Sequence, residues 1–465
     1  MRDKVVGREN VLWINDEGQG QAKRMNRGEP VRALRRMCAL MSLSFVCAFI
    51  LFAAIPVSAH STIHKAESNH QFTLEIYGNA NEDDTIDMRD VTYIKLVIFG
   101  KKPSTEFCDA NYDGRVSMLD VVQTKLIIVG KEGELTLRDC AKRVVTVSKP
   151  VKHVVSVSID DLRTLCALGA VDKIVARSYY VDKYAETLIP VVAYPEIKEI
   201  PSVGSYTEPN LELIVSLEPD VIFMYGGSER YVDAANSVQE KTGIPVVCIY
   251  HRTEMGYDFS LRAFRIMGWV LGKEEQERAE ELIAYTAEKV RELTDITSRI
   301  PESEKPRVYF FSAHRASFIE RAIPCYQPID IAGGINVAGE LPTCSVTEVS
   351  IEQIIKWNPD IILVHCFSKE PKITVESILS DPRLQTVNAV KNKRVYYTKG
   401  FYIGWDPASG LAEAYYLAKI FHPDIFKDLD VEAVGNEIFK EFYGVDGLYT
   451  YILEYFGKYY IPEPE

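Results

Sequence analysis

The chain has 465 residues, a formal charge of −13 and a content of 47% aliphatic and aromatic residues that is ordinary for a globular protein. This length exceeds what one hydrophobic core supports, so we expect two or three folding units. The acidic balance argues against nucleic-acid binding, because the surface would repel a phosphate backbone. Nine cysteines without a Cys-x-x-Cys pair argue against a zinc ribbon or a thioredoxin-type site.

The first predicted element is an export signal within an N-terminal extension at 1–59. Basic residues precede an apolar run at 37–57, and small residues that suit a signal peptidase close the run. A run of about 20 residues is also long enough to span a bilayer as an uncleaved anchor. We therefore expect an exported protein, extracellular, on the cell surface or periplasmic, that is either released or anchored by residues 37–57.

An internal repeat follows the export segment. The acidic loop at 79–90 recurs thirty positions later at 109–120, and each copy runs into an apolar, helix-like stretch. Oxygen-bearing side chains at loop positions 1, 3, 5, 9 and 12 are typical of a calcium loop, and glycine at position 6 permits its sharp turn. The candidate ligands of the second copy are Asp109, Asn111, Asp113, the carbonyl of Arg115, and Asp120. Those of the first copy are Asn79, Asn81, Asp83, Asp87 and Asp90.

The second copy is the stronger calcium candidate, because it carries Gly114 at position 6 where the first copy carries Asp84. For both copies the alternative is a solvated acidic turn. The paired loops at 74–135 resemble a type I dockerin, in which aspartate stands at position 12 and the loop-helix unit is duplicated. The resemblance implies a small all-α domain that binds Ca²⁺ and docks onto a cohesin module. Loop positions 10 and 11 would then face the partner, and they are Met88, Arg89, Met118 and Leu119.

From residue 143 onward, short apolar strands alternate with amphipathic helices. The predicted strands are at 154–158, 173–177, 220–225, 245–250, 307–312, 360–365 and 394–398. The predicted helices between them are at 160–168, 212–217, 231–242 and 351–356. A long charged helix at 273–300, without glycine or proline, separates the two blocks. This pattern predicts two α/β lobes with mostly parallel sheets, braced by one helix.

Four motifs in this region are similar to those of the solute-binding proteins that serve ABC importers of iron complexes and cobalamin. The motifs are at 203–222, 333–338, 349–362 and 389–396. The resemblance covers roughly residues 143–460 and implies two Rossmann-like lobes with ligand bound between them. It divides the domain at 143–465 into an N-lobe at 143–258, a linking helix at 259–300 and a C-lobe at 306–462.

Ligands of open α/β sheets bind beyond the carboxyl ends of the strands. The candidate ligand-binding residues, which follow predicted strands or lie in the family motifs, are Tyr179, Tyr180, Tyr206, Tyr225, Arg252, His314, Arg315, Tyr402 and Trp405. Aromatic, cationic and imidazole side chains suit a bulky, polar and often anionic chelate. For any one of these residues alone, an ordinary half-buried loop position is the better interpretation, but as a group they predict a ligand cleft.

In the resembled family, one glutamate on the outer surface of each lobe pairs with arginines of the membrane permease. The segments at 226–230 and 350–353 match those positions and nominate Glu229 and Glu352. For either residue the alternative is a solvated charge near a helix N-terminus. Two cysteine pairs, Cys108 with Cys140 and Cys325 with Cys344, are ones that an extracellular protein could bridge.

The resemblance implies a protein that is not an enzyme and that captures an iron(III) chelate such as a siderophore for an ABC importer. A corrinoid, haem and a molybdate-type oxyanion are the alternative ligands. The sequence has no His-Glu-x-x-His, no Gly-x-Ser-x-Gly and no phosphate-binding Gly-Lys-Ser/Thr loop. The alternative classes are a dockerin-borne scaffold or adhesion protein and a glycoside-acting enzyme with two cleft carboxylates.

Overall fold

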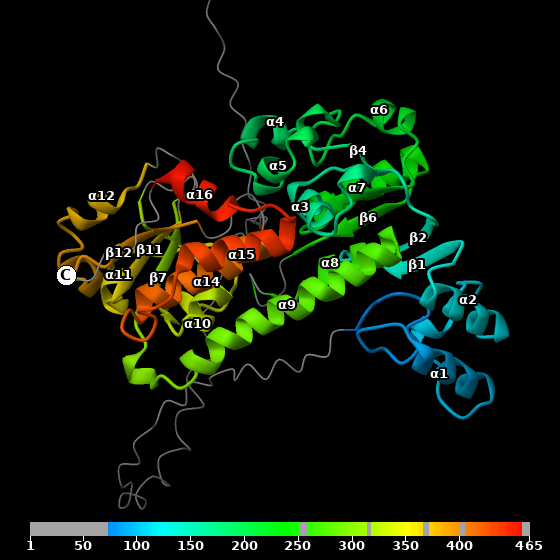
Figure 1. The fold of residues 1–465 in the computed structure, drawn as a ribbon, viewed down its shortest axis with the longest axis horizontal. Helices are drawn as coiled ribbons and strands as arrows, with labels where there is room; N and C mark the ends of the chain where they lie inside the picture. The colour runs from blue at the N-terminus through cyan, green and yellow to red at the C-terminus, as the bar shows by residue number, and fades with distance from the viewer. Residues whose placement is uncertain are drawn as a thin grey trace, which may run out of the picture. The chain divides into compact units, whose positions relative to one another are not determined.

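The structure is a computed structural model that describes residues 73–251, 256, 259–313, 318–365, 372–399 and 405–457 (Figure 1). The predicted export segment, with its apolar run at 37–57, lies outside these residues. Within the described ranges, no helix combines the length and the apolar character needed to cross a membrane.

The sequence repeat folds into two helices of 11 residues each. They are α1 (Met88–Ile98) and α2 (Met118–Ile128), with the 3-10 turn η1 (Glu106–Cys108) between them. Each helix starts with a capping box, in which the N-cap side chain and the aspartate three residues later exchange hydrogen bonds with the backbone. A small apolar cluster that includes Val91, Ile94 and Val121 joins the two helices. We call residues 73–132 the N-terminal module.

The first α/β lobe, here the N-lobe, is built on a parallel sheet in the order β4-β3-β5-β6. Its strands are β3 (Val154–Ser156), β4 (Ile174–Ala176), β5 (Val221–Tyr225) and β6 (Val246–Ile249). Its helices are α3 (Ile159–Ala167), η2 (Val171–Lys173), α4 (Tyr180–Tyr184), α5 (Ile189–Ala193), η3 (Pro195–Glu199), α6 (Leu211–Ser216) and α7 (Glu229–Thr242).

The second lobe, the C-lobe, has a mixed sheet in the order β10-β8-β7-β11-β12, with β9 also paired to β7. Its strands are β7 (Arg307–Ser312), β8 (Arg321–Ala322), β9 (Ile335–Asn336), β10 (Thr347–Glu348), β11 (Ile361–His365) and β12 (Val395–Thr398). Its helices are α10 (Gln327–Ile331), η5 (Val337–Glu340), α11 (Ile351–Trp357), α12 (Val375–Leu379) and α13 (Asn388–Lys391). The prediction of a mixed α/β fold is confirmed.

Two helices connect the lobes, and three more complete the chain. The connecting pair is α8 (Arg262–Leu271) and α9 (Lys273–Thr297), followed by η4 (Glu302–Glu304). The C-terminal helices are α14 (Pro407–Phe421), α15 (Val431–Tyr443) and α16 (Leu448–Phe456). The last two return to the N-lobe, where the hydroxyl of Tyr194 donates to the carbonyl of Tyr443 at 2.7 Å and that of Tyr451 to the carbonyl of Glu186 at 2.8 Å.

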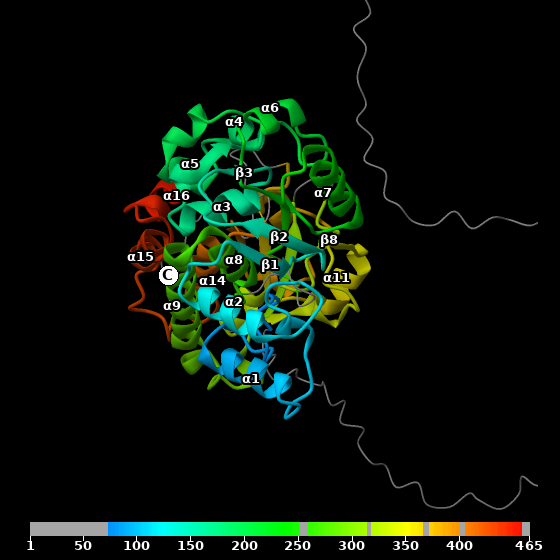
Figure 2. The same ribbon diagram turned by 90° about the vertical axis from the view of Figure 1, so that its right-hand side faces the viewer.

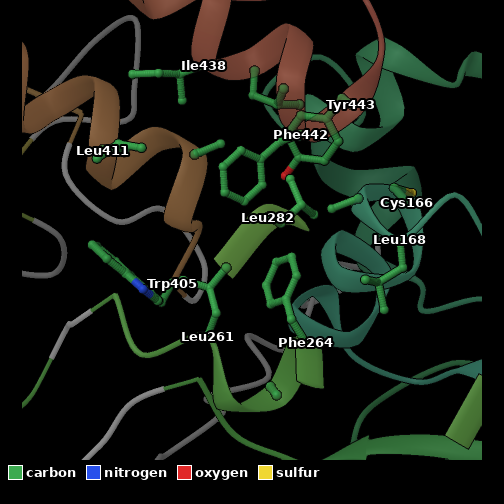
Figure 3. Close-up of a cluster of buried hydrophobic side chains, with 14 of the residues drawn as sticks. Cys166, Leu168, Leu261, Phe264, Leu282, Trp405, Leu411, Ile438, Phe442 and Tyr443 are labelled. Atoms are coloured by element: carbon green, nitrogen blue, oxygen red, sulfur yellow. The ribbon is translucent and has the colours of Figure 1, made fainter. Parts of the chain in front are cut away.

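Alternate residues of the central strands enter different cores, as the two-residue period of a strand requires. In β5, Phe223 joins the large cluster shared by both lobes, whereas Ile222 joins a cluster confined to the N-lobe. In β7, Phe310 likewise joins the shared cluster and Tyr309 a cluster of the C-lobe. One face of each sheet therefore contributes to a common core, which Figure 3 shows where α8, α14 and α15 meet around Phe264 and Phe442.

A β-hairpin links the N-terminal module to the N-lobe (Figure 2). Its strands are β1 (Glu134–Arg138) and β2 (Val144–Ser148). At its turn, the fully buried carboxylate of Asp139 accepts hydrogen bonds from the guanidinium of Arg143 at 2.7 and 2.9 Å and from the backbone N–H of Cys248 in β6 at 2.9 Å. Because hydrogen-bonded charges in a buried pair hold their geometry, the turn is fixed to the edge of the N-lobe sheet.

The open end of the hairpin is fixed by a buried lysine. The ammonium of Lys149 donates to the last carbonyls of α8, those of Trp269 at 3.2 Å and Val270 at 2.6 Å, and lies 3.8 Å from the carboxylate of Glu132 in the module. A cation at a helix C-terminus satisfies carbonyls that have no partner within the helix. Both side chains are only 6% exposed, so the module is joined to α8 through a buried ion pair.

We expect Lys149→Met to lower the free energy of unfolding by about 3 kcal/mol, because it leaves Glu132 charged, buried and unpaired. Adding Glu132→Gln in the same chain removes that charge and is expected to restore at least half of the loss. Denaturant unfolding measures both, with the exposed Lys152→Met as the matched control. A loss in Lys149→Met no larger than in the control would contradict the role given to this pair.

Candidate functional site

Three of the four parallel strands of the N-lobe deliver tyrosines at their carboxyl ends. Tyr179 and Tyr180 follow β4, Tyr225 is the last residue of β5, and Tyr250 follows β6. Tyr206 comes from the loop between η3 and α6, which isolated bridges pair to Arg177 and close at Gly204, where φ is +91°. The backbone therefore brings tyrosines from separate segments to one edge of the sheet.

These tyrosines form a continuous cluster of half-buried rings. Measured between ring centroids, Tyr180 lies 4.4 Å from Tyr179, 5.8 Å from Tyr184 and 5.1 Å from Tyr206. Tyr225 lies 5.0 Å from Tyr231, 5.5 Å from Tyr250 and 6.4 Å from Tyr206. These separations are those of edge-to-face and stacked aromatic pairs. We call the set of seven the tyrosine cluster: Tyr179, Tyr180, Tyr184, Tyr206, Tyr225, Tyr231 and Tyr250.

Four of the predicted ligand-binding residues meet in this cluster, namely Tyr179, Tyr180, Tyr206 and Tyr225. Four others lie outside the described residues: Arg252, His314, Arg315 and Tyr402. Trp405 is only 2% exposed and packs against Phe259 at 5.5 Å and Tyr326 at 6.1 Å. The structure therefore places Trp405 in the shared core and not among the tyrosines (Figure 3).

Sequence reasoning missed three members of the cluster. Tyr184 stands four residues after Tyr180, a spacing that puts both on one face of a helix and that could have been noticed. Tyr250 ends a predicted strand, so the argument from strand ends that selected Tyr225 could also have selected Tyr250. Tyr231 lies inside α7, and no local pattern separates it from an ordinary helix residue.

A buried polar network lies at the junction of the lobes. Arg163 of α3 pairs with Asp160 at 3.1 Å, and Nε2 of His251 lies 3.0 Å from the hydroxyl of Thr164. From the C-terminal part, Asp406 accepts from Ser409 at 2.5 Å and from Tyr443 at 3.1 Å, with the ammonium of Lys399 4.0 Å away. Burial lowers the pKa of Lys399 to about 8 and that of His251 to about 4, which leaves His251 neutral at physiological pH.

The two acidic loops share one hydrogen-bond pattern. At position 12, the fully buried carboxylates of Asp90 and Asp120 each accept from the backbone N–H groups of positions 3 and 9 at 2.7–3.2 Å. At position 5, Asp83 and Asp113 each accept from the N–H of position 7 at 3.0 Å. The sequence repeat is thus also a repeat of local structure.

The loops differ in how their oxygens are occupied. In the first, Oδ1 of Asn79 is buried without a hydrogen-bond partner among the described residues, but the guanidinium of Arg89 already pairs with Asp83 at 3.0 Å and Asp87 at 2.8 Å. In the second, no ion pair within the described part of the chain involves the loop carboxylates, and Gly114 has φ +86°. The donors of the second loop fit a hard cation better, although no group of three or more acidic, histidine or cysteine side chains placed to hold a metal is found in the described ranges.

Of the two predicted cysteine bridges, Cys325–Cys344 is present and Cys108–Cys140 is wrong. Cys108 is a free thiol in the core of the module, whereas Cys140 is a free thiol that packs on the cluster shared by the lobes. The two thiols therefore belong to different cores. Cys166 and Cys248 are buried free thiols.

The predicted docking residues Glu229 and Glu352 are both exposed. Glu229 is the first residue of α7, which follows β5, whereas Glu352 is the second residue of α11, which precedes β11. In the C-lobe, the hydrogen bonds that Glu352 accepts from its own backbone N–H and from Ser350 lower its pKa, so it carries its charge at neutral pH.

Comparison with known proteins identifies relatives of most of the chain. Residues 154–401 match the sequence model of a family described as periplasmic binding protein. The chain is 25% identical to the molybdate-binding protein MolA of Haemophilus influenzae over 331 residues, which cover 66% of this chain and 90% of that protein. It is 28% identical to the Fe(3+)-citrate-binding protein YfmC of Bacillus subtilis over 252 residues, which cover 54% of this chain and 74% of that protein.

Solved structures show the same fold. A periplasmic solute binding protein from Veillonella parvula matches 69% of this chain and 96% of its own, with a TM-score of 0.55 and 22% identity. MolA of Haemophilus influenzae with bound molybdate matches 67% of this chain and 98% of its own, with a TM-score of 0.53 and 21% identity. These relatives are named for binding and not for catalysis, which agrees with the prediction that the chain is not an enzyme.

Proposed function

The chain belongs to the periplasmic binding protein family, and we propose that it is an exported receptor that captures an iron(III) chelate for an ABC importer. The observation that carries the proposal is the tyrosine cluster at the carboxyl ends of β4, β5 and β6, where ligands of open parallel sheets bind. The similarity to an Fe(3+)-citrate-binding protein supports the same ligand class.

The cluster favours a chelate with an organic part over a bare oxyanion. A four-oxygen ion such as molybdate is small and is satisfied by a few N–H or O–H donors. Seven phenol rings connected through pairwise contacts present a broad surface that is apolar on its faces and polar at its hydroxyls. Such a surface matches the ring or backbone atoms of a chelator together with its oxygens. Corrinoid and haem remain the alternative ligands to an iron(III) chelate.

The proposal predicts that the purified chain binds ferric citrate or a ferric siderophore with a Kd of about 1 µM or tighter, and molybdate at least about 100-fold more weakly. Equilibrium titrations with ferric citrate, a ferric hydroxamate, cobalamin, haemin and molybdate measure this. Tyr180→Ala, which removes a central ring of the cluster, should weaken ferric-chelate binding, whereas Glu199→Ala, at an exposed position at the end of η3, should not. Preference for molybdate, or no binding of any iron chelate, would refute the proposed ligand.

For delivery, we propose that one glutamate on each lobe contacts the permease, with Glu352 on the C-lobe and Glu229 or Glu212 on the N-lobe. The two lobes repeat one arrangement, in which a capped helix precedes a central strand. Asn210 caps α6 before β5 as Ser350 caps α11 before β11, and Glu212 and Glu352 are the second residues of these helices. Glu212 is exposed, so this repeat adds it to Glu229 as a candidate.

Charge reversal at Glu352 combined with reversal of the N-lobe glutamate should abolish uptake and leave ligand affinity unchanged, because like charges would then face each other across the interface. Uptake in cells or proteoliposomes is compared for Glu352→Arg paired with Glu229→Arg and for Glu352→Arg paired with Glu212→Arg. Glu240→Arg, at the other end of α7, is the matched control. Full uptake in both double variants would exclude these residues as contacts.

We propose further that the N-terminal module binds Ca²⁺ through its second loop and attaches the receptor to a cohesin-like surface partner. The repeated hydrogen-bond pattern and the all-oxygen donors of the second loop support calcium. Met88, Met118 and Leu119 are 55%, 52% and 61% exposed, and large apolar side chains in contact with water on a small module favour a protein partner. Arg89 is engaged by Asp83 and Asp87, which weakens the case for calcium in the first loop.

Calorimetric titration of the full exported chain should then show one calcium site that is lost in the variant combining Asp113→Ala with Asp120→Ala. Removal of calcium with a chelator should lower the unfolding temperature of the unaltered chain only, because binding stabilises the folded state by mass action. Asp172→Ala, an exposed acid in η2, serves as the control. Absence of calcium heat in the unaltered chain would disprove the site.

A further inference from the structure

One member of the tyrosine cluster has a hydroxyl in an unusual position. The oxygen of Tyr206 accepts a hydrogen bond of 2.8 Å from the backbone N–H of Ile159, the first residue of α3. The first N–H groups of a helix have no partner within the helix and carry its positive end. The Tyr206 oxygen is therefore held by, and polarised toward, the N-terminus of α3.

The proton of the same hydroxyl is unused within the part of the chain that the structure describes. A phenol is both donor and acceptor, and the hydrogen bond from Ile159 uses only the acceptor. The ring cannot easily turn to find another partner, because Tyr180, Tyr225 and Tyr231 surround it at centroid distances of 5.1, 6.4 and 6.2 Å. A half-buried donor fixed in this way is oriented before any ligand arrives.

The surroundings keep this hydroxyl protonated. Its pKa is raised well above its usual value, first by burial and then by the neighbouring carboxylate of Asp160. A phenol must lose its proton to coordinate iron(III) directly, and this environment opposes that loss. A neutral phenol whose oxygen accepts a hydrogen bond is, in contrast, a stronger donor through its O–H.

We propose that Tyr206 donates its O–H to an anionic oxygen of the bound ligand and does not coordinate the metal. The inference rests on the proposed function and narrows the ligand to chelates that keep an anionic oxygen on their outer surface, such as a carboxylate, hydroxamate or catecholate oxygen. The iron then remains fully held by the chelator, and the protein recognises the complex through its periphery.

Tyr206→Phe tests this directly, because it removes one oxygen and retains the ring. Titrated with ferric citrate, this variant should bind about 10-fold to 100-fold more weakly, the range for a hydrogen bond to a charged acceptor. Tyr285→Phe, which removes a hydroxyl from α9 outside the tyrosine cluster, should change the affinity less than about threefold. The visible absorption spectrum of the iron-bound protein should be the same in the unaltered chain and in both variants, since no phenolate-to-iron band is expected from Tyr206.

Tyr206→His provides a second arm, because its ring N–H can replace the lost donor, and it should bind more tightly than Tyr206→Phe. Equal affinity of the unaltered chain and Tyr206→Phe would overturn the inference and leave the proposed function standing. Loss of a visible band in Tyr206→Phe would overturn it by showing direct coordination, and equal weakening in the Phe and His variants would show that the donor is irrelevant. Failure of the unaltered chain to bind any ferric chelate would instead refute the proposed function, and this inference with it.

Discussion

The length and attachment of α9 determine how the two sheets face each other. Its 25 residues extend for about 37 Å without a glycine or proline that could bend it. On the C-terminal side, the hydroxyl of Tyr415 donates to Glu292 of α9 at 2.7 Å, and Lys289 pairs with Glu437 of α15 at 2.9 Å. On the N-terminal side, Glu275 of α9 pairs with Lys173 of η2 in the N-lobe. A helix fastened at both ends leaves the lobes little freedom to separate.

The fixed placement of the lobes matters for ligand recognition by the tyrosine cluster. The end of β5 places Tyr225, and the loop after η3 places Tyr206, on one side of the proposed ligand site. This aromatic surface recognises a ligand only if the other side of the site is fixed as well. Burial and the charge of nearby Asp406, the N-cap residue of α14, raise the pKa of Asp160 in the first turn of α3 to about 6, so these two helix ends lie close together. Recognition in such a receptor depends on a site formed in advance, which reduces the entropy lost on binding.

Seven of the twelve strands in the described residues, the long helix and the duplicated loops could be predicted, because each rests on a local period or a local motif, whereas the hairpin strands β1 and β2 and the two-residue strands β8, β9 and β10 were missed. Contacts between distant segments could not be predicted. The return of α15 and α16 to the N-lobe brings Tyr443 to Tyr194, and no periodicity reports a contact over 249 residues. Trp405 shows a related limit, since a motif predicts where a residue stands along the chain but not whether neighbours such as Phe259 cover it. The cysteines follow the same rule: Cys325 and Cys344 are 19 residues apart in one lobe, whereas Cys108 and Cys140 are held by separate cores.

The hairpin between module and N-lobe has a mechanical consequence. A pull on the module enters β1 at Glu134, which pairs with Ser148, and from Ser148 the chain continues through Lys149 into the N-lobe. The load therefore arrives at the open end of the hairpin, where the ion pair of Lys149 with Glu132 and the hydrogen bonds of Lys149 to α8 resist before the ladder can open pair by pair. A receptor tethered through this module would transmit drag from its surroundings through the hairpin and spare the sheet that carries the tyrosines.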